Sequence, residues 1–236
     1  MMNKTGQNMA SGLSDGISVV IPARNEERNI DFIIKNTLPF CNEIIVVDGH
    51  SKDRTAQIAQ SYGVRIVKDN KKGKGDAVRV GAHAANYNIT VFMDADGSHD
   101  PVDIPRLTEP IIRGEADLVV GSRGTGGSDE LHGDIEKLLR MIGSDIILIG
   151  INMRWKQKLT DSQNGFRAIR TEVIRSLGLK ENITTIEQEM TMKCLKKGYR
   201  VGEVPAHEYE RKHGESTIKL RKVWFRYIYS FIKNIF

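Results

Sequence analysis

The segment GISVVIPARNE, residues 16–26, decides the fold. Its first six residues, 16–21, form a β-branched apolar run that stops at Pro22, a pattern typical of a buried parallel strand. Residues 26–38 follow with apolar side chains at helical spacing and acidic residues in the first turn, where the helix dipole favours them. A buried strand that leads directly into an amphipathic helix is the repeating unit of a parallel sheet.

The same alternation continues outward from this segment. We expect strands at 43–47, 64–67, 90–93 and 117–120, and helices at 53–62, 76–86 and 103–113. These repeated strand-then-helix steps predict an α/β fold with a Rossmann-like, mostly parallel sheet and helices on both faces.

The second half of the chain is less regular. A glycine-rich stretch at 121–133 predicts a mobile loop. After it we expect helices at about 134–149 and 186–197, strands at 165–169 and 200–205, and a last helix from about 217 to the end. The chain is therefore divided into a disordered tail at 1–15, a compact domain at 16–215 and a basic C-terminal amphipathic helix at 216–236.

The composition excludes several classes of protein. With 236 residues, 39% of them hydrophobic, the chain can bury one full core. Cys41 and Cys194 match no metal-ligand spacing and are too few for a secreted disulfide framework, so we expect a reducing, cytoplasmic setting. The first 14 residues lack the apolar region of a secretory signal. No apolar run reaches the roughly 18–20 residues of a spanning helix, so any membrane contact is expected to be peripheral.

Positive charge is concentrated at one end of the chain. The net charge is +5, and residues 211–236 hold seven Lys or Arg against one Glu, which leaves the remaining chain close to neutral. A surplus confined to one terminal segment is typical of a tail that faces anions, and it does not provide the broad basic surface that binds nucleic acid. We therefore expect no nucleic-acid partner.

Polar clusters follow three of the predicted strands: PARNE at 22–26, DGHSKD at 48–53 and DADGSH at 94–99. Ligands of open α/β sheets bind beyond the carboxyl ends of the strands. Asp94 and Asp96 place two hard oxygen ligands close together, which suits Mg²⁺ or Mn²⁺ shared with a diphosphate. A solvated turn with a helix cap is the alternative, and it would have to explain three clusters at once. Asp53 alone fits a helix cap.

Seven segments in series resemble a family 2 glycosyltransferase of the GT-A fold, closest to the dolichol-phosphate mannose or glucose synthase group. The resemblance runs from residue 17 to about residue 229. In chain order the segments are VVIPARNEERNI, IIVVDGHSKDRT, GKGDAV, VFMDADGSHDP, DLVVGSR, DSQNGFRAI and RKHGES. The resemblance implies that residues 16–215 are a GT-A catalytic domain that uses a nucleotide-sugar donor, carrying GDP or UDP, and Mg²⁺ or Mn²⁺.

The resemblance also implies roles for individual positions. The family lines its nucleotide pocket at Pro22, Arg24 and Glu26, and it holds base and ribose at Val46 and Asp48. The metal and nucleotide motif falls on Asp94, Ala95 and Asp96, with a further metal ligand at Ser98. Phosphate oxygens are implied to bind Arg123 and Arg211, for which the guanidinium fork is suited. Lys74 precedes a helix whose N-terminus suits phosphate, although a basic surface turn explains it equally well.

Two departures from the family pattern concern the acceptor side. Residues 214–217 read GEST where the family often has G-E-S-K, and the next lysine is Lys219. Residues 163–166 read QNGF in place of a common T-S-G-F. The Q-x-x-R-W signature of processive synthases is absent from the C-terminal third. The donor chemistry is therefore better defined than the acceptor.

The sequence favours an inverting transfer to a polyprenyl or dolichyl phosphate, in which Asp94, Asp96 and the metal stabilise the departing diphosphate. An anionic lipid phosphate needs no general base. A hydroxyl acceptor would need one, for which Asp161, Glu187 and Glu189 are the candidates. Transfer to a soluble or non-phosphate acceptor, including a retaining reaction, stays open. A sugar-1-phosphate nucleotidyltransferase is disfavoured because residues 22–26 contain no glycine.

The last helix separates charge from apolar surface. One face carries Lys219, Lys222, Arg226 and Lys233, and another carries Leu220, Trp224, Tyr227, Phe231 and Ile235. Such a helix suits a membrane interface, with its cations on lipid phosphates, at the cytosolic face of a membrane. Packing of the apolar side on the domain or in a homodimer is the equal alternative.

Overall fold

The computed structural model describes residues 12–129, 135–213 and 220–236, with side chains at 12–129, 141–213 and 224–236. The described strands form a seven-stranded sheet in the order β3-β2-β1-β4-β6-β5-β7. Only β6 runs antiparallel to its neighbours β4 and β5. The strands are β1 (Ser14–Ala23), β2 (Glu43–Asp48), β3 (Arg65–Lys68), β4 (Tyr87–Phe92), β5 (Leu118–Ser122), β6 (Arg167–Arg170) and β7 (Val201–Pro205). The predicted mostly parallel α/β sheet is confirmed.

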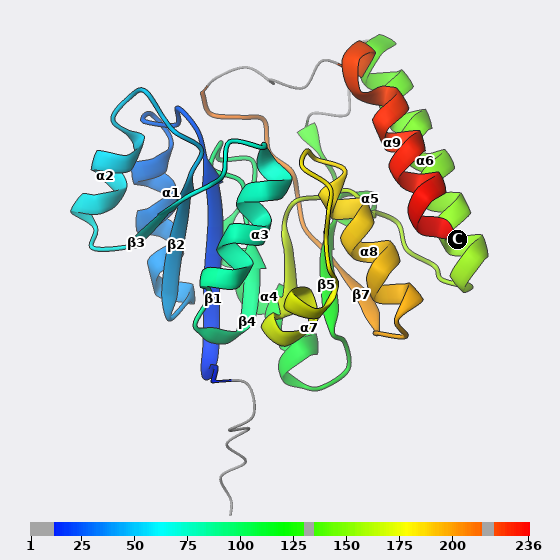
Figure 1. Ribbon diagram of the computed structural model, residues 1–236, viewed down its shortest axis with the longest axis horizontal. Coiled ribbons are helices and arrows are strands. Elements are labelled where there is room, and N and C mark those ends of the chain that lie inside the picture. The colour runs from blue at the N-terminus through cyan, green and yellow to red at the C-terminus, as the bar shows by residue number, and fades with distance from the viewer. Residues whose placement is uncertain (1–11, 130–134, 214–219) are drawn as a thin grey trace, which may run out of the picture.

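Helices cover both faces of this sheet (Figure 1). Because successive strand residues point to opposite faces, Val19 and Ile21 of β1 join one core cluster while Val20 joins another. The first cluster is closed by α1 (Ile30–Thr37), α2 (Thr55–Ser61) and α4 (Ile104–Ile112). The second is closed by α3 (Lys74–Ala84), α7 (Thr171–Ser176) and α8 (Ile186–Lys196). Short 3-10 turns lie at Leu38–Phe40 and Pro101–Asp103.

A third cluster joins the long helices of the second half. It contains Ile147 and Ile151 of α6 (Ile135–Trp155), Met192 and Leu195 of α8, and Ile235 of α9 (Leu220–Ile235). In Figure 1, α9 (red) lies alongside α6 (green) at one side of the sheet. The predicted C-terminal helix is therefore present, although residues 217–219 lie outside the described part of the chain. None of the described helices is both long and apolar enough to cross a membrane.

The strand order reverses between β1 and β4. From β1 the chain continues through α1 to β2 on one side, whereas β4 lies on the other side of β1. Such a switch point opens a crevice at the carboxyl ends of the two strands, where ligands of open α/β sheets bind. The carboxyl ends of the parallel strands lie at the top of the sheet in Figure 1.

Two segment predictions need correction. Strand β1 begins at Ser14, inside the predicted tail, because Ser14 pairs with Tyr87 of β4 across a bulge. The glycine-rich stretch contains the end of β5 and the short helix α5 (Arg123–Gly126). A Cβ on Gly121 would lie 2.8 Å from the Ala206 Cβ, so this glycine allows close packing. Residues 130–134 of that stretch are not described.

Other predicted helices and strands differ at their ends. The first helix begins at Ile30, four residues late, because the Ile30 N–H closes a turn by donating to the Glu26 carbonyl. Helix α6 continues past 149 to Trp155 and ends before Lys156, which has a positive φ of 54°. Helix α7 was missed because six residues are too few to show helical periodicity.

Candidate active site

The predicted strand-end clusters converge at the crevice. The loops after β1 and β2 are joined by hydrogen bonds, with the Asn25 N–H donating to Ser51 Oγ (3.0 Å) and the Lys52 N–H to Asn25 Oδ1 (2.8 Å). The end of β1 and the loop after β4 meet at a small pocket that Pro22 and Asp94 both line. Three segments that are separate in sequence thus surround one place at the end of the sheet.

Lys74 lies between two carboxylates beneath this crevice. Its Nζ is 2.7 Å from Asp94 Oδ1 and 3.1 Å from Glu187 Oε1. Helix α3 begins at Lys74, and Glu187 lies in the first turn of α8. The other Glu187 oxygen, Oε2, is buried and has no hydrogen-bond partner within the described residues. Arg167, fully buried beside the same pocket, donates to the carbonyl of Glu187 (2.8 Å).

The three charges shift one another's pKa. Burial would raise the pKa of Asp94, but Lys74, His99 and Arg211 together lower it to about 2. Burial raises the pKa of Glu187, and Lys74 and Arg167 offset this only in part. Burial opposes the charge of Lys74, yet the two carboxylates outweigh it and raise the Lys74 pKa. Asp94 and Lys74 are therefore a fixed ion pair, while Glu187 is the carboxylate most ready to take up a proton.

A glycine makes this pairing sterically possible. A Cβ on Gly165 would lie 3.0 Å from both Asp94 Oδ2 and Lys74 Nζ. Gly165 belongs to the QNGF stretch in which the chain departs from the family pattern. The departure therefore leaves the glycine, and the space it gives to the ion pair, in place.

Asp96 is held by a different set of groups. The N–H and Oγ of Ser98 both donate to Asp96 Oδ1 (3.1 and 2.7 Å), and Arg211 Nη2 lies 3.3 Å from Asp96 Oδ2. The segment after β7 reaches the motif as well, because the Tyr209 N–H donates to the Ser98 carbonyl (2.9 Å) and the Lys212 N–H to that of Asp96 (3.3 Å). Residues 206–213 thus form a strap that brings Arg211 over Asp96.

The predicted nucleotide pocket is partly brought together. Arg24 is exposed and Glu26 is half-buried at the crevice, and burial raises the pKa of Glu26. Asp48 is buried and accepts the Ser51 N–H (2.9 Å). Val46, by contrast, is fully buried in the core, so its side chain has no surface to offer a base or ribose. It lies two residues before the end of β2, which explains why it packs inside.

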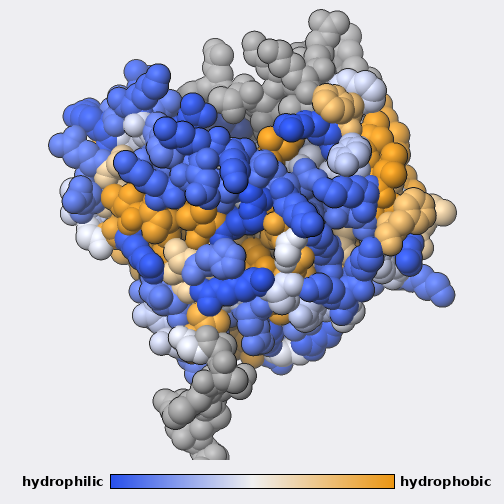
Figure 2. All heavy atoms as spheres, viewed as in Figure 1, coloured by the Kyte–Doolittle hydropathy of each residue, from blue (hydrophilic) through white to orange (hydrophobic). Residues whose placement is uncertain are grey.

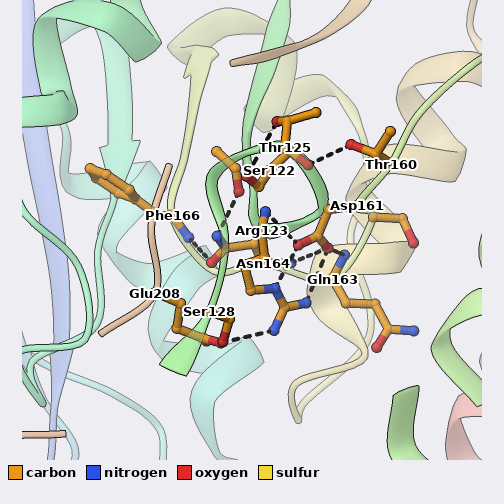
Figure 3. A network of polar contacts seen from close by, with 12 residues as sticks. Ser122, Arg123, Thr125, Ser128, Thr160, Asp161, Gln163, Asn164, Phe166 and Glu208 are labelled. Atoms are coloured by element: carbon orange, nitrogen blue, oxygen red, sulfur yellow. Dashed lines mark hydrogen bonds and ion pairs between the residues drawn. The ribbon is translucent and has the colours of Figure 1, made fainter. Parts of the chain in front are cut away.

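Arg123 is clamped by two carboxylates. Its Nε donates to Asp161 Oδ2 (2.6 Å) and its Nη2 to Asp161 Oδ1 (3.1 Å). Its Nη1 lies 3.5 Å from Glu208 Oε2, which also accepts the hydroxyl of Ser128 (2.6 Å). Figure 3 shows this network, which joins the start of α5 to the strap. Burial opposes ionisation of Asp161, but Arg123 and backbone N–H groups lower its pKa, so Asp161 is a poor proton acceptor.

Two further predicted residues have mainly packing surroundings. Glu189 is fully buried; it accepts the backbone N–H groups of Lys180 and Glu181 and pairs with Lys193. Its carboxylate therefore fixes the loop before α8. Ala95 is 4% exposed, and its side chain packs in the core. Only the backbone of Ala95 therefore lies beside the two aspartates at the site.

The donor chemistry at Asp94 and Asp96 suits a hard divalent cation. Among the residues that the structure describes, no three His, Cys, Asp or Glu side chains form a metal-binding group. Mg²⁺, however, usually takes one or two carboxylates, waters and substrate phosphates. Asp96 and the Ser98 hydroxyl bonded to it supply such oxygens, with Asp94 two residues away. Asp94 pairs with Lys74, and Asp96 pairs with Arg211. A divalent ion bound here would therefore share the two carboxylates with these two side chains.

Two participants were missed from the sequence. Glu208 lies in no motif, and no local signal points to it, because its partners Arg123 and Ser128 are 80 residues or more away in the chain. Arg167 lies within the quoted segment DSQNGFRAI, and a charged residue among the apolar residues of the strand expected at 165–169 was a usable signal. Its guanidinium donates to the carbonyl groups of Asn164, Ser162 and Glu187.

Comparison with known proteins gives one family. The model of the family described as "Glycosyl transferase family 2" matches residues 18–178. A dolichol-phosphate mannosyltransferase from Pyrococcus furiosus is 35% identical over 92% of this chain, and the match spans 64% of that relative's length. An undecaprenyl-phosphate mannosyltransferase from Micrococcus luteus is 31% identical over 86% of this chain and 87% of the relative.

Solved structures share the fold. Glucosyl-3-phosphoglycerate synthase from Mycobacterium tuberculosis, crystallised with Mg²⁺ and uridine diphosphate, superposes with a TM-score of 0.75 at 22% identity, over 94% of this chain and 80% of that one. The same enzyme with Mn²⁺, uridine diphosphate and glucosyl-3-phosphoglycerate gives 0.73, over 100% and 86%. At this identity the likeness concerns the arrangement of strands and helices.

Proposed function

The chain belongs to glycosyl transferase family 2 and is a glycosyltransferase, and from this premise we propose that it moves a sugar from a GDP- or UDP-sugar to a polyprenyl phosphate. The observation that carries the proposal is the placement of Asp94 and Asp96 at the switch point between β1 and β4, with Lys74 and Arg211 on their carboxylates. Two carboxylates at this sheet edge can bind a divalent ion, and the lysine and arginine beside them can bind the oxygens of a diphosphate.

The donor occupies the crevice in this proposal. Arg24, Glu26 and Asp48 line the nucleoside end, and Asp94 and Asp96 lie at the diphosphate end. Arg211, already over Asp96, and Lys74, at the start of α3, are placed to bind phosphate oxygens. Arg123 binds phosphate from the opposite side, oriented by Asp161, which engages two of its nitrogens.

We propose Mg²⁺ or Mn²⁺ as the cofactor, held by Asp94, Asp96 and Ser98. When bound, the ion supplies positive charge that stabilises the leaving diphosphate. The M. tuberculosis synthase that shares the fold was crystallised with Mn²⁺ in one structure and with Mg²⁺ in another, which supports the choice. The protein's own share is to fix the carboxylates in advance: Ser98 orients Asp96, and Gly165 leaves room for Lys74 to orient Asp94.

The acceptor is proposed from the two relatives named for prenyl phosphates. An oxygen of the acceptor phosphate forms a bond to the anomeric carbon as the bond from that carbon to the donor diphosphate breaks, and a nucleoside diphosphate leaves. The nucleophile is already an anion and gives up no proton. Attack from the face opposite the leaving group inverts the anomeric configuration.

Transfer to a soluble or hydroxyl acceptor is the competing proposal. The raised pKa of Glu187 favours it. A hydroxyl nucleophile must lose a proton to a base with a suitably raised pKa. Among the three proposed bases, Asp161 has a lowered pKa and Glu189 is occupied by backbone N–H groups, whereas burial raises the pKa of Glu187.

We also propose that residues 16–215 form the catalytic unit and that residues 216–236 form an attached helix. We further propose that the protein is cytoplasmic and makes peripheral contact with the cytosolic face of a membrane. Both cysteines are free thiols, as in a reducing compartment. A homodimer through the last helix is the competing use of that segment.

The decisive experiment follows the label of a radioactive donor sugar. The protein is incubated with Mn²⁺, labelled GDP-mannose or UDP-glucose, and either undecaprenyl phosphate or a panel of soluble acceptors, and the products are partitioned between butanol and water. We expect label in the butanol phase only when the lipid phosphate is present. Label confined to water-soluble glycosides would overturn the lipid acceptor, and Glu187→Gln would then be the variant that tests the base.

A further inference from the structure

Helix α9 presents its more apolar side outward. Six large apolar side chains at its surface are between 45% and 84% exposed, whereas Ser230 and Asn234 are buried at 0% and 6%. The six are Trp224, Phe225, Ile228, Tyr229, Ile232 and Phe236. An amphipathic helix that only packs on its own domain would turn these side chains inward. The outward side of α9 is therefore built for contact with something other than this domain.

Helix α6 carries a second apolar stripe. Ile142, Ile146, Ile149 and Met153 recur at intervals of four, three and four residues, so they lie on one side of the helix, and they are 46% to 77% exposed. Its neighbouring residues Ile147 and Ile151 point into the third core cluster and supply the packing that the helix needs. The exposed stripe is thus not required to hold α6 on the domain.

The two stripes belong to one pair of packed helices. A Cβ on Gly150 of α6 would lie 2.4 Å from Phe231 Cζ of α9, so the helices approach closely at this point. Ten of the fifteen large hydrophobic side chains exposed in the described residues lie on this pair or at its end. Figure 2 shows apolar atoms gathered along the right-hand edge, where α6 and α9 lie. Such a concentration marks an interaction surface.

Charge identifies the occupant. Residues 135–158 and 220–236 contain nine Lys or Arg against two acidic residues, and Arg154, Lys156, Lys158, Arg226 and Lys233 are exposed. A second copy of the chain would bring two positively charged surfaces together, which disfavours a homodimer. A layer of anionic headgroups over a hydrocarbon interior complements both the charge and the exposed aromatic rings, which favour the membrane interface.

We propose that α6 and α9 together form a binding surface for a membrane that contains anionic phospholipid. The inference deepens the proposed function and rests on it for its purpose, because a polyprenyl phosphate acceptor is found in a membrane. Both helices are close in sequence to the crevice: α6 ends six residues before Asp161, and α9 begins nine residues after Arg211. Binding through this pair would hold the acceptor side of the site at the lipid surface.

The test is co-sedimentation with vesicles, without donor or acceptor, so that it can fail separately from the transfer assay. Wild-type protein is mixed with vesicles of phosphatidylcholine alone or of phosphatidylcholine with phosphatidylglycerol. We expect binding to the anionic vesicles. The double variants Ile146→Glu/Ile149→Glu and Ile228→Glu/Ile232→Glu should each weaken it by ~10-fold or more. All four positions are exposed, so the melting temperature should be unchanged.

Matched controls place the same change elsewhere. Val102, in the 3-10 turn Pro101–Asp103, and Ile112, the last residue of α4, are 63% and 66% exposed and belong to neither α6 nor α9. Val102→Glu/Ile112→Glu should bind vesicles like wild type, and Arg226→Gln/Lys158→Gln should weaken anionic binding about 5-fold per charge removed. Equal binding by all variants would overturn the proposal. So would a wild-type dimer that binds no vesicles and that Ile228→Glu/Ile232→Glu converts to monomer.

Discussion

The ammonium nitrogen of Lys74 lies 2.7 Å from Oδ1 of Asp94, twenty residues further along the chain. The pair joins the start of α3 to the end of β4 and so crosses the switch point of the sheet. Because Glu187 lies on the other side of the same ammonium, one cation balances two carboxylates from separate parts of the chain. The predicted metal motif is therefore part of a buried charge network, and the network can be tested apart from catalysis.

Replacing Lys74 by methionine should lower the free energy of unfolding by about 2–3 kcal/mol. The substitution keeps the apolar length of the side chain but leaves Asp94 and Glu187 without their shared counter-charge. Removing one partner of a fully buried pair costs about 3–5 kcal/mol, and the cost is smaller here because the Lys74 and Asp94 side chains are 26% and 27% exposed. Urea unfolding followed by circular dichroism measures the change. Lys72→Met, at an exposed position of the preceding loop, is the control and should unfold like wild type. An unchanged midpoint in Lys74→Met would show that the pair contributes nothing to folding.

The same pair predicts a pH dependence. The pKa of Asp94 is lowered to about 2 from an ordinary value of 3.8, and a shift of this size corresponds to about 2 kcal/mol. Since the folded-state pKa is the lower one, this stability is present above about pH 4 and is lost as the pH falls towards about 2. Asp94→Asn should therefore be less stable than wild type at neutral pH, and the difference should shrink over that acid range. Urea unfolding of both proteins at several pH values measures it. A difference independent of pH would contradict the assignment.

The strand-end clusters could be predicted because they depend on local patterns. A buried run such as residues 16–21 fixes a strand, and the strand's end fixes where the next polar residues lie. The partners of those residues could not be predicted in the same way. Lys74 and Glu187 are 113 residues apart, and Arg123 and Glu208 are 85 apart, so only the folded sheet brings them together. The position of Val46 shows the same limit: it shares a face of β2 with Asp48, and the motif does not reveal that, two residues before the strand ends, it lies inside the core.

Gly165→Ala should impair the site while leaving the domain folded. The added methyl group would lie 3.0 Å from Asp94 Oδ2 and Lys74 Nζ, so one of these side chains must move. We expect kcat/KM for the donor to fall about 10-fold or more, since small displacements of catalytic groups are costly. Gly143→Ala is the control, because a Cβ there meets nothing within 4 Å. Wild-type kinetics in Gly165→Ala would mean that the position of the ion pair does not matter to transfer.

Glu208→Gln should affect the donor more than the acceptor. Its Oε2 accepts the Ser128 hydroxyl and lies 3.5 Å from Arg123, so the side chain ties the strap to the segment after α5. Because Arg123 is proposed to bind donor phosphate, weakening that tie should raise the KM for the donor several-fold, with the acceptor KM nearly unchanged. Glu210→Gln, two residues along the same strap and exposed, is the matched control. Equal changes in both KM values, or none, would show that Glu208 does not support donor binding through Arg123.

Asp96→Asn should abolish metal-dependent nucleotide binding without unfolding the protein. The amide keeps the size of the side chain and can still accept from Ser98, but it loses the negative charge that a divalent ion requires. Bound ligand raises the melting temperature of the native state, so wild type should gain stability from GDP or UDP together with Mn²⁺ and much less from either alone. In Asp96→Asn the extra gain should vanish, and turnover should fall by about 10²-fold or more, since charge stabilisation of the leaving group is lost. Glu115→Gln, an exposed acid outside the crevice, should behave like wild type in both measurements. If Asp96→Asn kept the full metal-dependent shift and full turnover, the divalent ion would have to be held elsewhere, and the role proposed for the strand-end aspartates would be wrong.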